Sequence, residues 1–80
     1  MMLFKEYDMV RVKQLIIQDR WWTGSAEVKR PPAIGDCATI VDIPKGSDSW
    51  LTTECIDKNG QTIWVADFII EELELFEETP

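Results

Sequence analysis

The sequence predicts an all-β protein, a small barrel of five short strands with one 3-10 turn before the last strand. Stretches in which apolar and polar residues alternate recur along the 80 residues, and this is the pattern of half-buried strands. Asn59-Gly60 separates two of these stretches and favours the tight turn of a hairpin. A closed barrel is preferred because an open sheet without a covering helix would leave an apolar face and both edges exposed.

The first strand is expected within residues 8–15, where Val10 and Val12 face one side and Arg11 and Lys13 face the other. The alternation then stops. A long loop is expected over residues 16–35, which gather Gly, Ser and Pro residues. Loops of this length in compact domains are usually functional or covered by a partner.

A short strand or turn is expected inside the long loop at residues 26–28. Pro31-Pro32 and the turn at Gly35-Asp36 end the loop, and residues 37–43 are rich in the β-branched side chains of a strand. We therefore interpret residues 31–43 as a scaffold segment that starts the second strand.

The third strand is expected at residues 50–56. Its alternation places Leu51, Thr53 and Cys55 inward and Trp50, Thr52 and Glu54 outward.

The hairpin at residues 57–60 predicts that this strand pairs with a returning strand at residues 61–65 as an antiparallel neighbour. Residues 67–72 are expected to form the 3-10 turn, and Leu73-Glu74-Leu75 the short fifth strand. Residues 1–80 are thus one domain with an acidic C-terminal end at residues 71–80.

This arrangement resembles the SH3-like barrels, in particular the group that includes a small accessory protein of photosystem I and the β subunit of nitrile hydratase. The likeness spans Asp8 to Leu75. It rests on Val10-Arg11-Val12, on Gly35–Val41 where the group reads Gly-x-x-Gly-Thr-Val, on Thr53-Glu54-Cys55, and on Phe68-x-x-x-Glu72-Leu73. The chain is also similar to small uncharacterised bacterial proteins of this barrel type, found among standalone and mobile genes. The resemblance implies a fold, because the matched positions are scaffold residues in the relatives.

Two positions depart from the pattern of this group. Ala38 stands where the group has a second glycine, so the backbone there has to tolerate a Cβ. Cys55 stands where an aromatic residue is expected, which leaves room in the core that Trp50 or Trp64 could fill.

The charge is acidic and unevenly placed. Residues 1–40 carry six Lys/Arg against five Asp/Glu, residues 41–80 carry two against ten, and the net charge is −7. This balance argues against nucleic acid as a partner, because Lys and Arg supply most of the affinity for phosphates. A cationic partner or simple solubility fits better.

Nothing in the sequence predicts an enzyme, a metal site or a cofactor. The chain has no histidine, and no serine or cysteine lies in a nucleophile motif. Cys37 and Cys55 are expected as unreactive core thiols, with a disulfide between them as the alternative. The N-terminus has the pattern of neither a signal peptide nor a membrane-spanning helix, so a cytoplasmic protein is expected.

The expected function is binding of a protein partner through tryptophans. Trp21 and Trp22 are adjacent in the long loop and cannot both face inward in an extended segment. Trp50 and Trp64 are expected on the outward faces of the two hairpin strands as a cross-strand pair. With Arg20 as their polar companion, these four residues are the candidate anchors, since Trp and Arg are enriched at interface hot spots.

Several alternatives stay open for these tryptophans. The loop indoles can fold back as lids on a small core, and the strand pair can be covered by the long loop or by a second copy of the chain. A small-molecule pocket at the two loop indoles and a polyproline groove of Trp21, Trp22 and Trp50 are further alternatives.

The second functional hypothesis is an acidic immunity or inhibitor-type protein that binds a basic protein such as a toxin. It rests on five carboxylates near the C-terminal end: Glu71, Glu72, Glu74, Glu77 and Glu78. A charge run of this kind is more often a solvated face or a frayed tail. Binding through carboxylates would weaken with added salt, whereas binding through tryptophans would not.

Overall fold

The structure is a computed structural model that describes residues 4–47 and 49–76, and in this part of the chain it contains strands and no α-helix. The strands in chain order are β1 (Met9–Val12), β2 (Trp22–Thr23), β3 (Cys37–Asp42), β4 (Trp50–Ile56), β5 (Thr62–Ile69) and β6 (Leu73–Leu75). One turn of 3-10 helix, η1 (Ile70–Glu72), separates the last two strands. The all-β prediction and the 3-10 turn before the last strand are confirmed.

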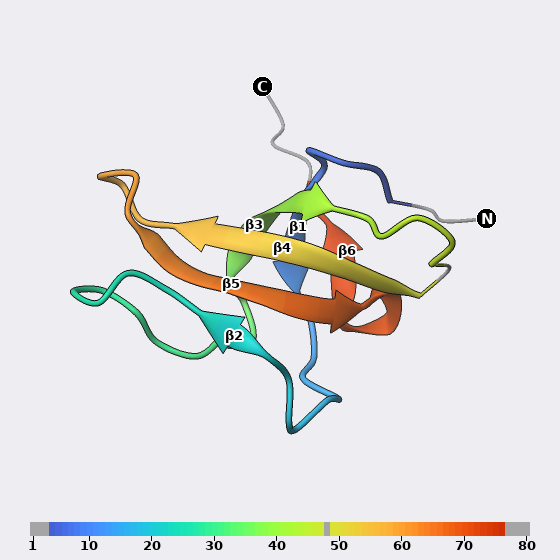
Figure 1. Cartoon of the computed structure of the whole chain (residues 1–80), viewed down its shortest axis with the longest axis horizontal. Coiled ribbons are helices and arrows are strands. Elements are labelled where there is room, and N and C mark those ends of the chain that lie inside the picture. Colours follow the sequence, from blue (N-terminus) through green and yellow to red (C-terminus); the bar gives the residue numbers. More distant parts are fainter. Residues whose placement is uncertain (1–3, 48, 77–80) are drawn as a thin grey trace.

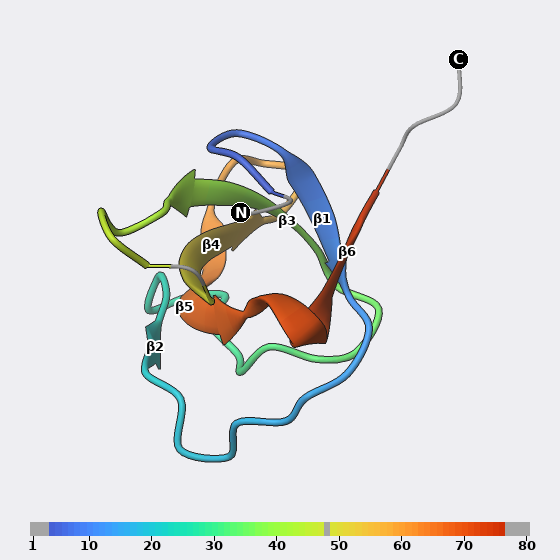
Figure 2. The ribbon, with the colours of Figure 1, turned by 90° about the vertical axis from the view of Figure 1, so that its right-hand side faces the viewer.

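All six strands belong to one antiparallel sheet with the order β2-β5-β4-β3-β1-β6. The long strands β4 and β5 cross in front of β3, β1 and β6 (Figure 1), and the view turned by 90° shows how strongly the strands bend around the centre (Figure 2). Strands β2 and β6 are the two edges, and among the described residues no pairing joins them. The predicted closed barrel of five strands is therefore wrong in strand count and in closure.

The sixth strand is β2, which lies inside the long loop. Trp22 pairs with Ala66 and Thr23 pairs with Val65 at the free edge of β5. The expected strand or turn at residues 26–28 is a turn. Two residues are too few to show an alternating pattern, so β2 becomes visible only through its pairing with β5.

Strand β5 also continues further than the sequence pattern indicates. Asp67 lies opposite Thr52 and Ile69 lies opposite Trp50, so the pairing with β4 keeps residues 67–69 extended. The 3-10 turn is thereby confined to the three residues of η1, and β6 follows where the last strand is predicted.

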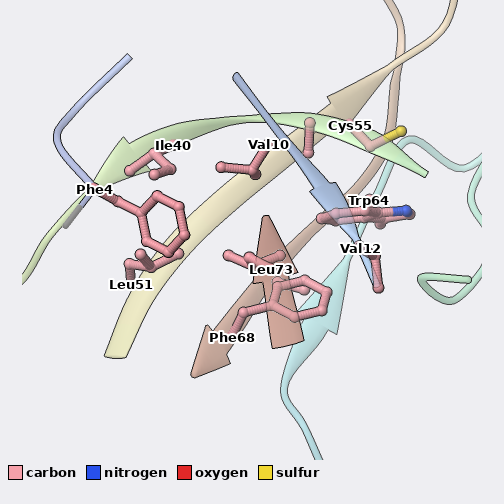
Figure 3. Packing of buried hydrophobic residues seen from close by; sticks show 11 residues of the cluster. Phe4, Val10, Val12, Ile40, Leu51, Cys55, Trp64, Phe68 and Leu73 are labelled. Atoms are coloured by element: carbon pink, nitrogen blue, oxygen red, sulfur yellow. The ribbon is translucent and has the colours of Figure 1, made fainter. Parts of the chain in front are cut away.

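The core lies between the crossing strands (Figure 3). Its largest side chains are Trp64 and Phe68, which are fully buried with their ring centroids 5.4 Å apart. The inward residues predicted for β1 and β4 are all buried, so the alternation of these strands is confirmed. The apolar core consists of Phe4, Val10, Val12, Ala38, Ile40, Leu51, Cys55, Trp64, Ala66, Phe68 and Leu73.

The predicted outward position of Trp64 is wrong, because this indole is 0% exposed. It lies opposite Cys55 on β4 and fills the room beside that small side chain. Trp50 lies opposite Ile69, so the two tryptophans do not form a cross-strand pair. Apolar residues occur on both faces of β5, and the register with β4 rather than the local pattern decides which face is inward.

The two cysteines differ in burial. Cys55 is a buried core thiol as predicted, whereas Cys37 is exposed, because Ala38 takes the inward position at the start of β3. Both thiols are free. Ala38 tolerates its Cβ because its backbone is an ordinary strand; Tyr7 is the one non-glycine residue of the described chain with a positive φ.

Gly24 approaches the backbone of β5 more closely than a side chain would allow. A Cβ at this position would lie 2.3 Å from the carbonyl oxygen of Ile63 and 2.9 Å from the Cβ of Lys29. Because the carbonyl belongs to a paired strand, we expect Gly24→Ala to lower the free energy of unfolding by about 3 kcal/mol in urea denaturation.

Gly35→Ala is the matched control for this substitution. Gly35 has a φ of +97°, but a Cβ there would meet no atom within 4 Å, so we expect a loss of only about 1 kcal/mol from backbone conformation. Equal losses for the two variants would contradict a steric role of Gly24.

Candidate functional site

Arg20 and Glu72 form an ion pair buried at the base of the long loop, with side chains 6% and 0% exposed. The two terminal nitrogens of the guanidinium donate to the two carboxylate oxygens. They also donate to the carbonyl oxygens of Asp67 at 2.9 Å and Ile17 at 3.1 Å. The guanidinium lies 4.1 Å from the ring centroid of Phe68, which adds a cation–π contact.

The carboxylate of Glu72 also accepts hydrogen bonds from the backbone. The backbone N–H groups of Ile16, Ile17 and Ile69 donate to it at 2.7, 3.2 and 3.1 Å. Burial alone would raise the pKa of Glu72, but the hydrogen bonds from Arg20 and from these backbone groups outweigh burial and hold the pKa below its ordinary value. The pair thus joins the start of the long loop to β5 and η1.

These positions correct two expectations from the sequence. Arg20 is not a polar companion on an exposed patch, and Glu72 does not belong to an acidic surface. The two residues are 52 positions apart, so no local pattern indicates that they meet.

The other four carboxylates of the predicted acidic end are not equivalent either. Glu71 is exposed, and Glu74 forms an exposed ion pair with Arg11 at 2.8 Å. Glu77 and Glu78 lie outside the described residues. Of the described carboxylates of this end, Glu71 and Glu74 are therefore exposed and only Glu72 is buried.

Asp36 ties the other end of the long loop to the core. Its carboxylate accepts two hydrogen bonds from Arg30 at 2.8 and 2.9 Å, one from the indole N–H of Trp64 at 2.9 Å and one from the backbone of Ala33 at 2.9 Å. Burial acts to raise the pKa of Asp36, yet these donors hold it below the ordinary value. This arrangement supports the interpretation of residues 31–43 as scaffold.

The two arms of the long loop border an open pocket of about 330 Å³. Its walls are about equally polar and apolar, and the guanidinium of Arg20 is already paired with Glu72. Trp22 faces this side and packs against the core, so it does not share a surface groove with its neighbour Trp21. The pocket is lined by Leu15, Ile17, Gln18, Arg20, Trp22, Pro31 and Pro32.

The outer face of β3, β4 and β5 carries three carboxylates. Antiparallel partners point to the same side of a sheet. The register of β3 with β4 shifts by one residue between Ile40 and Asp42, and it thereby places Asp42, Thr52 and Asp67 in one row across the three strands. Thr52 donates to Asp67 at 2.8 Å. Glu54 lies two residues further along β4 on the same face and accepts a hydrogen bond from Thr62 at 2.6 Å. None of these strands contains Lys or Arg.

Two tryptophans border these carboxylates. Trp50 begins β4 on the outer face, as predicted, and is 43% exposed. Trp21 directly precedes β2; its carbonyl oxygen accepts a hydrogen bond from the N–H of Asp67 at 3.4 Å, and its side chain is 57% exposed. Because Trp22 faces the core, the adjacent Trp21 faces the outer side. We call the surface formed by Trp21, Asp42, Trp50, Glu54 and Asp67 the acidic-aromatic face.

Local contacts constrain the backbone at both exposed tryptophans. The hydroxyl of Ser47 accepts from the N–H of Trp50 at 2.9 Å and donates to its carbonyl oxygen at 3.0 Å. Trp21 follows Arg20, whose side chain is locked to Glu72. The backbone segments that carry the two indoles are therefore constrained by the fold itself.

Sequence reasoning identifies the two indoles of this face but not Asp42 and Asp67 as members of it. The only local signal is the alternation of β4, which places Glu54 outward as predicted. Asp42 and Asp67 become its neighbours through strand register, which a single sequence does not display.

Comparison with protein-family models, with curated proteins and with solved structures finds no significant match. Within residues 4–47 and 49–76, no helix is long and apolar enough to cross a membrane. The same residues contain no group of three His, Cys, Asp or Glu side chains that could hold a metal ion. The candidate site is therefore assigned from its geometry.

Replacing Glu72 by Gln keeps the shape of the side chain but leaves the buried Arg20 without a counter-ion. We expect Glu72→Gln to lower the free energy of unfolding at neutral pH by about 3 kcal/mol, measured by urea denaturation. Glu74→Gln, which breaks the exposed pair with Arg11, is the control and should cost less than about 1 kcal/mol. Similar losses of free energy of unfolding for the two variants would mean that burial does not make the pair of Arg20 and Glu72 more important for stability than an exposed pair.

The same ion pair makes stability depend on pH. Because the pKa of Glu72 is lower in the folded than in the unfolded chain, its contribution is complete above about pH 4.5 and is lost as pH falls through the folded-state pKa. The lowered pKa of Asp36 makes stability depend on pH in the same direction, but Asp36 is present in both the unsubstituted protein and the Glu72→Gln variant. We therefore expect acid to destabilise the unsubstituted protein more steeply than Glu72→Gln. Parallel pH profiles would contradict this assignment.

Proposed function

We propose that this protein is a non-enzymatic interaction module that binds a protein partner through the acidic-aromatic face. The observation that carries the proposal is the exposure of Trp21 and Trp50, 57% and 43%, on one side of one sheet. Large aromatic side chains are enriched at the energetic centres of protein interfaces. Exposed apolar groups gathered on one surface also mark interaction sites.

The extensive strand pairing beneath this face favours binding. Strands β4 and β5 pair at seven positions from Trp50 to Ile56, which makes them the most extensively paired strands of the sheet. Anchors that are already ordered lose little conformational entropy when a partner binds. The face therefore suits recognition with little rearrangement of its backbone.

We also propose that the chain is a relative of the SH3-like barrels whose sheet stays open between β2 and β6. The hairpin between β4 and β5 and the 3-10 turn before β6 support this relationship. This relationship concerns the fold alone and implies no particular partner.

The test is capture of partners from a lysate of the native host with Trp21→Ala/Trp50→Ala. We expect this double variant to lose at least about ten-fold of the partner recovered by the unsubstituted protein, because hot-spot truncation commonly costs that much. Ile34→Ala is the control, since Ile34 is 64% exposed but lies in the loop before β3.

The buried Trp64 and the partly buried Trp22 remain in every variant, so tryptophan fluorescence on urea denaturation verifies the fold. Recovery of the same partners by the folded double variant would show that the two indoles are not the anchors.

A further inference from the structure

We infer that the segment bound by the acidic-aromatic face is rich in lysine or arginine and extended in conformation. The inference rests on the proposed function and adds the chemistry of the partner. Its first support is the sign of the charge: Asp42, Glu54 and Asp67 come from three strands onto one face, and strands β2 to β5 contain no Lys or Arg.

The spacing of the carboxylates matches an extended basic chain. Asp42 and Asp67 lie on either side of Thr52 in one row, so their Cα atoms are separated by two strand spacings, about 10 Å. Glu54 lies two residues from Thr52 on the same face of β4, about 7 Å along the strand. Alternate side chains of an extended peptide also repeat at about 7 Å, so basic residues at alternate positions can reach neighbouring carboxylates.

The carboxylates keep acceptor capacity for such a partner. Thr52 donates to Oδ1 of Asp67 and Thr62 donates to Oε2 of Glu54. Within the described residues, the second oxygen of each group accepts no side-chain hydrogen bond. The threonines therefore orient the carboxylates and leave one oxygen of each available to a guanidinium or an ammonium group.

The tryptophans at the border of the face also favour a basic partner. The exposed indoles of Trp21 and Trp50 can bind cations through their ring faces. Arg20, which directly precedes Trp21 in the chain, cannot occupy the ring face of that indole because it is buried against Phe68 and paired with Glu72. No cation of these strands competes with a basic partner.

The charges also argue against other occupants of this face. A second copy docked through the same surface would bring its three carboxylates against those of the first, which is unfavourable. Nucleic acid would be repelled for the same reason. The net charge of −7 instead attracts a basic chain at a distance and favours rapid association.

The test uses a fluorescently labelled peptide of alternating lysine and serine, with binding followed by anisotropy at low ionic strength. The face variant is Asp42→Asn/Glu54→Gln/Asp67→Asn, in which the amide oxygens can still accept from Thr52 and Thr62. The matched control, Glu6→Gln/Glu27→Gln/Glu74→Gln, changes the formal charge equally at positions off the face.

We expect the face variant to weaken peptide binding at least about ten-fold and the control to change it less than about three-fold. Equal weakening in both would mean that the peptide senses only net charge, and failure of the unsubstituted protein to bind would also overturn the inference. A dimer of the unsubstituted protein that the face variant abolishes, seen by sedimentation, would identify a second copy as the occupant instead.

The lysate capture separates this inference from the proposed function. If Trp21→Ala/Trp50→Ala loses the cellular partner and the face variant keeps it, the interaction module stands and the basic partner is wrong. If the peptide depends on the carboxylates while both indole substitutions leave the lysate partner unchanged, the role of the tryptophans as anchors is wrong.

Discussion

The buried ion pair of Arg20 and Glu72 is the interaction on which the rest of the structure depends. Ordering a long loop without regular structure costs conformational entropy that a core of this size does not easily offset. The carboxylate of Glu72 accepts hydrogen bonds from the loop, from β5 and from the guanidinium of Arg20. Glu72 therefore stays ionised although it is buried. Asp36 acts in the same way at the far end of the loop through Arg30 and Trp64.

The position of the long loop determines the surface that the protein presents. Once Arg20 is held, the next residues run along the edge of β5 and pair there as β2, so Trp22 turns toward the core and Trp21 toward the outer face. The acidic-aromatic face thus depends on an ion pair that contributes no atom to it. Stability and the position of Trp21 are coupled because Trp21 directly follows Arg20 in the chain.

The local patterns succeeded where one face of a strand is apolar and the other is polar. In β1 and β4 the alternation identifies the inward residues, and at Asn59-Gly60 the turn requires the positive φ of Gly60, +82° in the structure. The same reasoning failed on β5, because Ile63 and Val65 are as apolar as the buried Trp64. Only the register with β4 decides between the two faces.

The sequence by itself determined the all-β class, the location of most strands, the late hairpin and the acidic balance, because each of these follows from residues close together in the chain. The tertiary structure alone decided which tryptophans are exposed, which glutamate is buried and which carboxylates share a face. Those outcomes depend on strand register and on contacts such as that between Arg20 and Glu72, 52 residues apart. The burial of a side chain depends on many such distant contacts together, and a local sequence pattern does not contain that information.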